Sequence, residues 1–120
     1  MVAKKGRENP KKSVSCPVET TLDVIGGRWK VLALYYLMPG TKRFGELQRA
    51  LAGISARTLA KQLRELEADG IIDRRVYSQI PPKVEYSLTA AGKRLEPVLQ
   101  AMHRWGEGLE TGRSARKVAK

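Results

Sequence analysis

Hydrophobic positions along the chain recur first with a helical period, then with the period of a strand, and then with a helical period again. The clearest helical segment is GISARTLAKQLRELEADG, in which Leu59, Leu63 and Leu66 fall within one narrow sector at roughly 100° per residue. Ser55 is a good N-cap, and the glycine that closes the segment is a natural residue to follow a last turn. The pattern predicts a helix from about Ser55 to Asp69.

The opposite side of this predicted helix is basic. It carries Arg57, Lys61 and Arg64, together with Ala68. One side is therefore suited to a hydrophobic core and the other to a partner, although an ordinary solvated amphipathic helix would have the same pattern.

Three further helical segments precede the basic helix. CPVETTLDVIGG predicts a short first helix that Gly26 and Gly27 close, and residues 29–38 are apolar nearly all round, as in a buried central helix. KRFGELQRALAG has Phe44, Leu47 and Leu51 on one side, and Gly53 then turns the chain into the basic helix. Two helices joined by a short glycine-containing turn predict a helix-turn-helix, whose second helix is offered to the major groove of DNA.

The residues after Gly70 predict a β-hairpin. In IIDRRVYSQIPPKVEYSLT, Val84, Tyr86 and Leu88 alternate with polar residues, which is typical of a half-buried strand. SQIPP cannot continue a paired ladder because proline has no N–H to donate, so it forms the tip. A helix-turn-helix followed at once by a hairpin is a winged helix, with the hairpin as the wing.

A last helix follows the hairpin. Thr89 is its expected N-cap, and large apolar residues recur after it at steps of three and four up to Leu109. Pro97 lies inside this pattern, so we expect a kink, or a break with Pro97 opening a second segment. The expected fold class is mainly α with a β-hairpin (α+β).

Three long motifs resemble a known family. CPVETTLDVIGGRWK, RFGELQRALAGISARTLAKQLRELEADGII and PPKVEYSLTAAGKRLEPVL are similar to the HxlR-type winged helix-turn-helix transcriptional regulators, and the resemblance covers about Cys16 to Leu109. It implies a DNA-binding winged helix that works as a homodimer, with the first and last helices forming most of the interface. Independently, the last helix has more large apolar side chains than a small domain readily covers.

Net charge points to the same class of partner. The 120 residues form one domain and carry 23 Lys+Arg against 12 Asp+Glu, a net charge of +11, which favours nucleic acid or an anionic surface. Residues 1–15 and 111–120 each contribute +4, leaving +3 for residues 16–110. Since both ends have few large apolar side chains, we expect flexible basic tails flanking a DNA-binding and dimerisation domain.

Candidate DNA contacts lie mainly on the basic helix. Arg57 and Lys61, near its start, can donate to guanine O6 and N7. Thr58 suits a thymine methyl or a phosphate, Gln62 suits adenine, and Arg64, one turn deeper, suits the DNA backbone. Taken separately, each of these residues would also serve as solvated surface.

Further candidates would contact flanking phosphates or the minor groove. The hydroxyl of Ser55 is partly engaged if it caps the helix, but it can still approach a phosphate. The other candidates precede the helix-turn-helix or lie on the hairpin, and they are Arg43, Arg74, Arg75, Gln79 and Lys83. Because neighbouring residues of a strand point to opposite faces, Arg74 and Arg75 cannot both face DNA.

Cys16 is a candidate redox sensor. It begins the first helix, where unpaired N–H groups and the nearby Lys11 and Lys12 favour the reactive thiolate form. Some regulators that resemble this chain use an N-terminal cysteine to sense oxidants or electrophiles. The alternative is a partly buried cysteine that packs against its helix.

Other classes of function are poorly supported. One cysteine excludes an intrachain disulfide and, with no transmembrane run and no apolar signal segment, favours the cytoplasm. His103 is the single histidine, so no Cys/His metal site is available. No cofactor motif or catalytic constellation is recognised either, so we do not expect an enzyme. Because the sequence has no transmembrane run, we do not expect a membrane protein. The alternative function is a sequence-indifferent architectural or RNA-binding protein that relies on its basic tails, or else a protein-interaction module. The sequence identifies neither the operator nor an effector, and repression of transcription is the expected mode of regulation.

Overall fold

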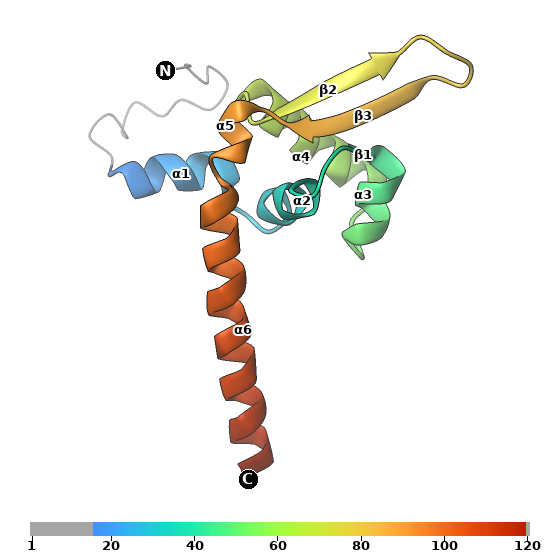
Figure 1. Ribbon diagram of the computed structural model, residues 1–120. Coiled ribbons are helices and arrows are strands. Elements are labelled where there is room, and N and C mark those ends of the chain that lie inside the picture. The colour runs from blue at the N-terminus through green and yellow to red at the C-terminus, as the bar shows by residue number, and fades with distance from the viewer. Residues whose placement is uncertain (1–15, 120) are drawn as a thin grey trace.

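The computed structural model describes residues 16–119 as a winged-helix body from which one long helix projects (Figure 1). The elements are α1 (Pro17–Ile25), α2 (Trp29–Leu37), β1 (Lys42–Arg43), α3 (Phe44–Ala50), α4 (Ala56–Ala68), β2 (Ile72–Tyr77), β3 (Lys83–Leu88), α5 (Ala90–Lys93) and α6 (Glu96–Ala119). The predicted order of helices and hairpin is confirmed. No helix among the described residues is long and apolar enough to cross a membrane.

The hydrophobic core lies between the helix-turn-helix and the sheet. Helix α2 packs against α4, α3, β3 and α6, which makes it the central helix that its apolar sequence predicts. Leucines form most of the core, and those with almost no exposed surface are Leu34, Leu37, Leu47, Leu51, Leu59, Leu63, Leu66 and Leu99. Burial of the apolar side of α4 therefore holds its other side outward.

Polar caps define where the helices begin. The Ser55 hydroxyl accepts the backbone N–H of Thr58 at 3.1 Å, and α4 follows it directly. The Thr89 hydroxyl likewise accepts the backbone N–H of Gly92 at 3.1 Å, at the start of α5. Gly70 ends the α4 segment at a φ of 76°, a conformation that glycine adopts without steric cost. These predicted ends are confirmed.

The sheet has one strand more than the sequence predicts. Its order is β1-β3-β2, all antiparallel, and β1 pairs Lys42 with Tyr86 and Arg43 with Glu85. A two-residue strand is too short to produce an alternating pattern, so its presence depends on pairing with β3. The sheet thereby joins the chain just before α3 to the wing.

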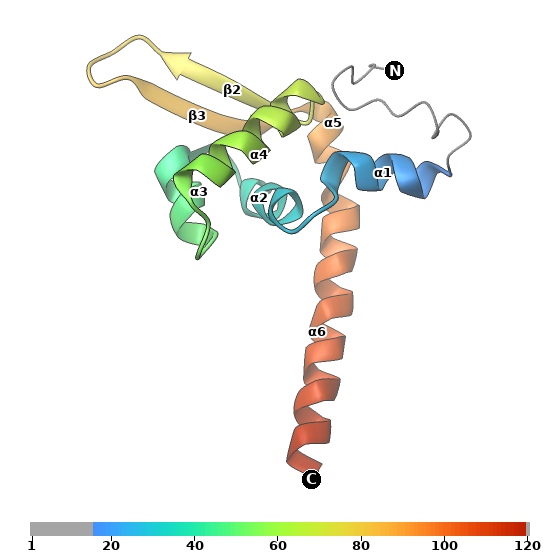
Figure 2. The same cartoon turned by 180° about the vertical axis from the view of Figure 1, so that it is seen from behind.

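The last helical segment is broken at the predicted place. Helix α5 ends at Lys93, and α6 begins at Glu96 with Pro97 in its first turn, where proline loses no intrahelical hydrogen bond. Helix α6 then runs away from the body, with α1 on one side of it and the wing on the other (Figures 1 and 2). It continues through residues 111–119, which the composition assigns to a tail, because a helix can add hydrogen-bonded residues beyond its last core contact.

Candidate nucleic-acid interface

Helix α4 separates a buried apolar side from an exposed basic one, and it lies in front of α2 in Figure 2. Leu59, Leu63 and Leu66 each have at most 1% of their surface exposed. Arg57, Lys61 and Arg64 are exposed, while Thr58 and Gln62 are half-buried between the two sides. The five candidates on the helix thus share one continuous surface.

The beginning of this surface is held by two hydroxyl groups. The Ser55 hydroxyl accepts the Thr58 backbone N–H and also donates to the Thr58 side-chain oxygen at 3.0 Å. Both side chains are therefore engaged at the N-terminus of α4. The Thr58 hydroxyl keeps its own O–H, which can donate to a phosphate, whereas the single O–H of Ser55 is already donated to Thr58.

An ion pair that sequence reasoning missed joins α4 to the buried helix α2. Lys30 of α2 is 4% exposed, and its ammonium pairs with the Glu65 carboxylate of α4. Glu65 also lies 3.8 Å from the ammonium of Lys61, one turn earlier. Glu65 therefore connects the core to one of the candidate base-reading side chains. The available signal was a single lysine within an otherwise apolar helix.

The hairpin register assigns the two neighbouring arginines to different faces. Arg74 lies opposite Tyr86, which is 7% exposed and belongs to the core face. Arg75 lies opposite Glu85 on the other face, and both arginines are exposed. The structure thus separates them, as the sequence predicts.

The face that carries Arg75 gathers charge around Glu85. On one side Arg43 of β1 pairs in register with Glu85, and on the other side Arg75 of β2 does the same. The Lys83 ammonium is 3.4 Å from the Glu85 carboxylate and 4.7 Å from the centre of the Tyr77 ring. A hydrogen bond from Tyr77, then the nearby Lys83 and Arg43 charges, hold the pKa of Glu85 below its ordinary value of 4.5.

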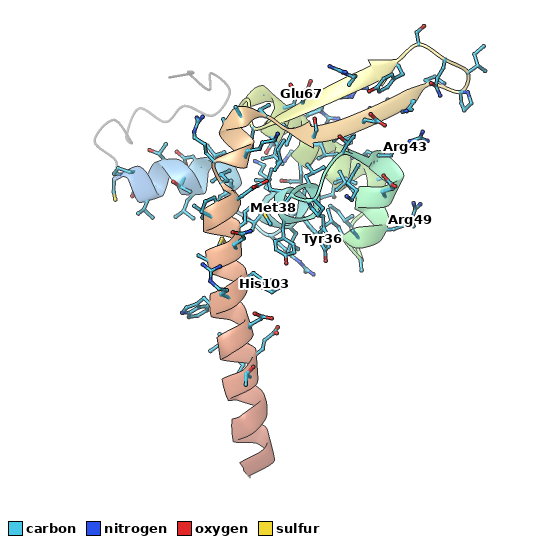
Figure 3. The ribbon with its side chains drawn as sticks, in the orientation of Figure 1. Tyr36, Met38, Arg43, Arg49, Glu67 and His103 are labelled. Carbon is cyan, nitrogen blue, oxygen red and sulfur yellow. The ribbon has the colours of Figure 1, made fainter. Side chains whose placement is uncertain are left out.

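Two candidates remain to be placed, one inside this cluster and one outside it. Arg43 lies at the start of α3, labelled in Figure 3, and its backbone N–H donates to the Glu46 carboxylate at 2.7 Å, which leaves its exposed guanidinium outside the cap. Gln79 is exposed in the loop at the tip of the hairpin. The structure therefore brings Arg43, Arg75 and Lys83 together and leaves Gln79 apart.

Cys16 lies at the other end of the molecule from the wing tip. It is the N-cap of α1, is exposed, and its sulfur accepts the backbone N–H of Val18 at 3.5 Å. The alternative of a partly buried cysteine is therefore wrong, because α1 packs against the core at its C-terminal end, through Val24 and Ile25. Lys11 and Lys12, invoked beside it, lie outside the described residues.

Apolar side chains remain exposed on α1 and α6. Val18 and Leu22 of α1 are 64% and 59% exposed. Along α6, Val98, Met102 and Trp105 line a shallow apolar groove. On another side of the same part of α6, the His103 ring, labelled in Figure 3, stacks on Tyr35 of α2 with ring centres 5.3 Å apart. One side of α6 is thus held to the body, while another side presents apolar surface to solvent.

Comparison with known proteins agrees with this architecture. The model of the HxlR-like helix-turn-helix family matches residues 24–113. The chain is 60% identical over 92 residues to the uncharacterized HTH-type transcriptional regulator YdeP of Bacillus subtilis (strain 168), a match that covers 77% of this chain and 72% of YdeP.

Solved structures of the redox regulator HypR are also similar. The reduced form superposes with a TM-score of 0.79 at 53% identity and covers 83% of this chain and 99% of HypR. The oxidised form gives a TM-score of 0.75 at 58% identity, covering 78% and 96%. Together with the winged-helix topology and the exposed basic side of α4, these matches show that the chain belongs to the HxlR-like helix-turn-helix family of DNA-binding transcriptional regulators.

Proposed function

We propose that this regulator represses transcription by binding pseudo-palindromic operator DNA as a homodimer, with α4 reading bases in the major groove. The observation that carries the proposal is the two-sided character of α4, whose leucines are buried while Arg57, Lys61 and Arg64 stay exposed. Arginine and lysine at the start of a recognition helix can donate to guanine edges. A dimer that occupies promoter DNA blocks polymerase without further machinery.

The test is fluorescence anisotropy of the full chain on its own upstream intergenic DNA and on a shuffled duplex, at near-physiological salt. We expect wild type to prefer the upstream duplex and Arg57→Ala/Lys61→Ala to lose that preference, since each good base contact contributes roughly 1–3 kcal/mol of discrimination. A matched control, Lys93→Ala/Arg94→Ala, removes the same charge from two exposed residues, the last of α5 and the one that follows it. It should weaken binding to both duplexes equally, if at all.

Two results would contradict base reading by α4. If the wild-type chain binds both duplexes equally and with a steep salt dependence, the alternative of a sequence-indifferent basic protein is favoured. If the control variant loses preference as much as Arg57→Ala/Lys61→Ala, the effect is one of net charge. No binding of either duplex would favour a protein-interaction module.

The homodimer is supported by the exposed apolar side chains of α1 and α6. An apolar surface of this kind on a small domain marks an interaction site, and two-fold symmetry would match a pseudo-palindrome with half-sites about 10–10.5 bp apart or a multiple of that spacing. Trp105→Glu should yield monomers in sedimentation velocity, because the 71% exposed side chain is outside the monomer core. A variant that remains a dimer would exclude this part of α6 from the interface.

We also propose that Cys16 responds to oxidants or electrophiles. Its exposure at the N-cap of α1 supports access by a reagent, and the relative HypR is a redox regulator solved in oxidised and reduced forms. In the oxidative form of the response, two Cys16 thiols of a dimer lose two protons and two electrons to diamide and form one disulfide. Mass spectrometry after mild diamide or methylglyoxal treatment, with DNA affinity measured in parallel, tests this; unmodified Cys16 with unchanged affinity would remove the idea.

A further inference from the structure

We propose that the outer face of the wing is a binding site for a backbone phosphate of DNA, and that the Glu85 carboxylate occupies this site as an internal anion until DNA displaces it. The outer face is the side of the sheet that carries Arg43, Glu85, Arg75, Lys83 and Tyr77. This inference rests on the proposed function and deepens it, because it selects the face of the wing and the arginine that meet DNA.

The first argument is the arrangement of charge across three strands. Arg43, Glu85 and Arg75 lie side by side in register on β1, β3 and β2, and Lys83 is two residues from Glu85 on the same face. Three cations therefore surround Glu85. Asp73, opposite Ser87 on the same face, adds a second carboxylate, so the face keeps an excess of one positive charge. Such an excess around a central anion is the arrangement expected of a site for a second, stronger anion.

The second argument is which of the cations are already paired. Lys83 is half-buried and forms the ion pair with Glu85, whereas no salt bridge involves Arg43 or Arg75 among the described residues. Two exposed guanidinium groups are thus available, and a planar guanidinium can donate two parallel hydrogen bonds to a phosphate. Lys83 becomes available as a third donor when Glu85 releases it.

The third argument is the shape of the face. A hollow of about 440 Å³ is lined there by polar side chains that include Asp73, Arg75, Tyr77, Glu85 and Ser87. Arg74 also borders the hollow, but its register opposite Tyr86 assigns it to the core face. The geometry therefore selects Arg75 as the arginine of β2 that contacts phosphate.

The charge of Glu85 then limits the affinity of the wing for DNA. A phosphate that approaches Arg75 and Lys83 is repelled by the carboxylate and competes with it for the ammonium group. In Glu85→Gln the amide oxygen can still accept the Tyr77 hydrogen bond, so the sheet is preserved while the competing charge is removed. We expect up to about fivefold tighter binding, which corresponds to the upper end measured for ion pairs near a protein surface. The plot of log affinity against log salt should become steeper by at most about 0.9, the value of one fully neutralised phosphate, because the carboxylate no longer opposes the cations that neutralise it.

The experiment measures anisotropy of the full chain on the upstream and shuffled duplexes across a salt series. Because backbone contacts carry no sequence information, Glu85→Gln should tighten binding to both duplexes by the same factor. Glu110→Gln, a matched charge change on the exposed surface of α6, should leave the slope unchanged. Adding Arg75→Gln to Glu85→Gln should abolish the gain, whereas adding Arg74→Gln should retain it. Unfolding curves for each variant confirm that the fold is intact.

The outcomes separate this inference from the proposed function. If wild type prefers the upstream duplex but Glu85→Gln changes neither affinity nor slope, the phosphate site is overturned and the regulator stands. The site is also overturned if Glu110→Gln has the same effect, or if Arg74→Gln rather than Arg75→Gln removes the gain. If wild type binds neither duplex, both the regulator and the phosphate site are overturned.

Discussion

Removing one partner of the Lys30–Glu65 pair should destabilise the protein by an amount that depends on which partner is left behind. The Lys30 side chain is 5% exposed and that of Glu65 is 32% exposed. In Glu65→Gln the buried ammonium loses its carboxylate and cannot reach water, a situation that costs about 3–5 kcal/mol. In Lys30→Met the remaining carboxylate is partly solvated and still has Lys61 nearby, and methionine keeps most of the volume, so we expect a cost of about 1 kcal/mol.

The double variant Lys30→Met/Glu65→Gln should be more stable than Glu65→Gln alone, since no buried charge is left unpaired. The expected coupling energy is about 2–3 kcal/mol, a large share of the 5–15 kcal/mol typical of a domain. Urea unfolding followed by circular dichroism measures all four proteins, at one protomer concentration because dimerisation would shift the apparent stability. A cost of Glu65→Gln no larger than that of Lys30→Met would refute the reasoning that burial of the orphaned charge sets the penalty.

Three further predictions concern the helix-turn-helix and the wing. Leu63→Ala should lower the free energy of unfolding by about 2–5 kcal/mol, because the side chain is 1% exposed and its loss leaves a cavity; an unchanged urea midpoint would argue against this packing. Ser55→Ala should cost about 1 kcal/mol in thermal unfolding, since the Thr58 N–H loses its cap, and a stability equal to wild type would mean that the cap is dispensable. The lowered pKa of Glu85 means that its contribution to stability is complete above pH 4.5 and is lost as the pH falls through the folded-state value. In Glu85→Gln the free energy of unfolding should therefore fall less steeply at acid pH than in wild type. An NMR titration of Glu85 with a midpoint at or above 4.5 would contradict the Tyr77 and Lys83 contacts.

Most of the fold could be predicted because the signals are local. The spacing of leucines in α4, the caps Ser55 and Thr89, and the alternation of Val84, Tyr86 and Leu88 each depend on residues within a few positions of one another. A hydrophobic period of 3.6 or 2 residues indicates which side of a helix or strand is buried, whichever element it packs against. The exposed basic side of α4 is the direct complement of its buried leucines, and it could be predicted for that reason.

The tertiary structure decided the features that join residues far apart in the chain. Lys30 and Glu65 are brought together by the packing of α2 on α4, and the row Arg43–Glu85–Arg75 exists because a two-residue strand pairs with the hairpin. No local period encodes such a register, since it is set by how whole elements fit on a shared core. The sequence by itself therefore determined the winged helix and the exposed basic side of α4. Only the packing of the core and the pairing of the strands decided which of its charges are buried, paired or available to DNA.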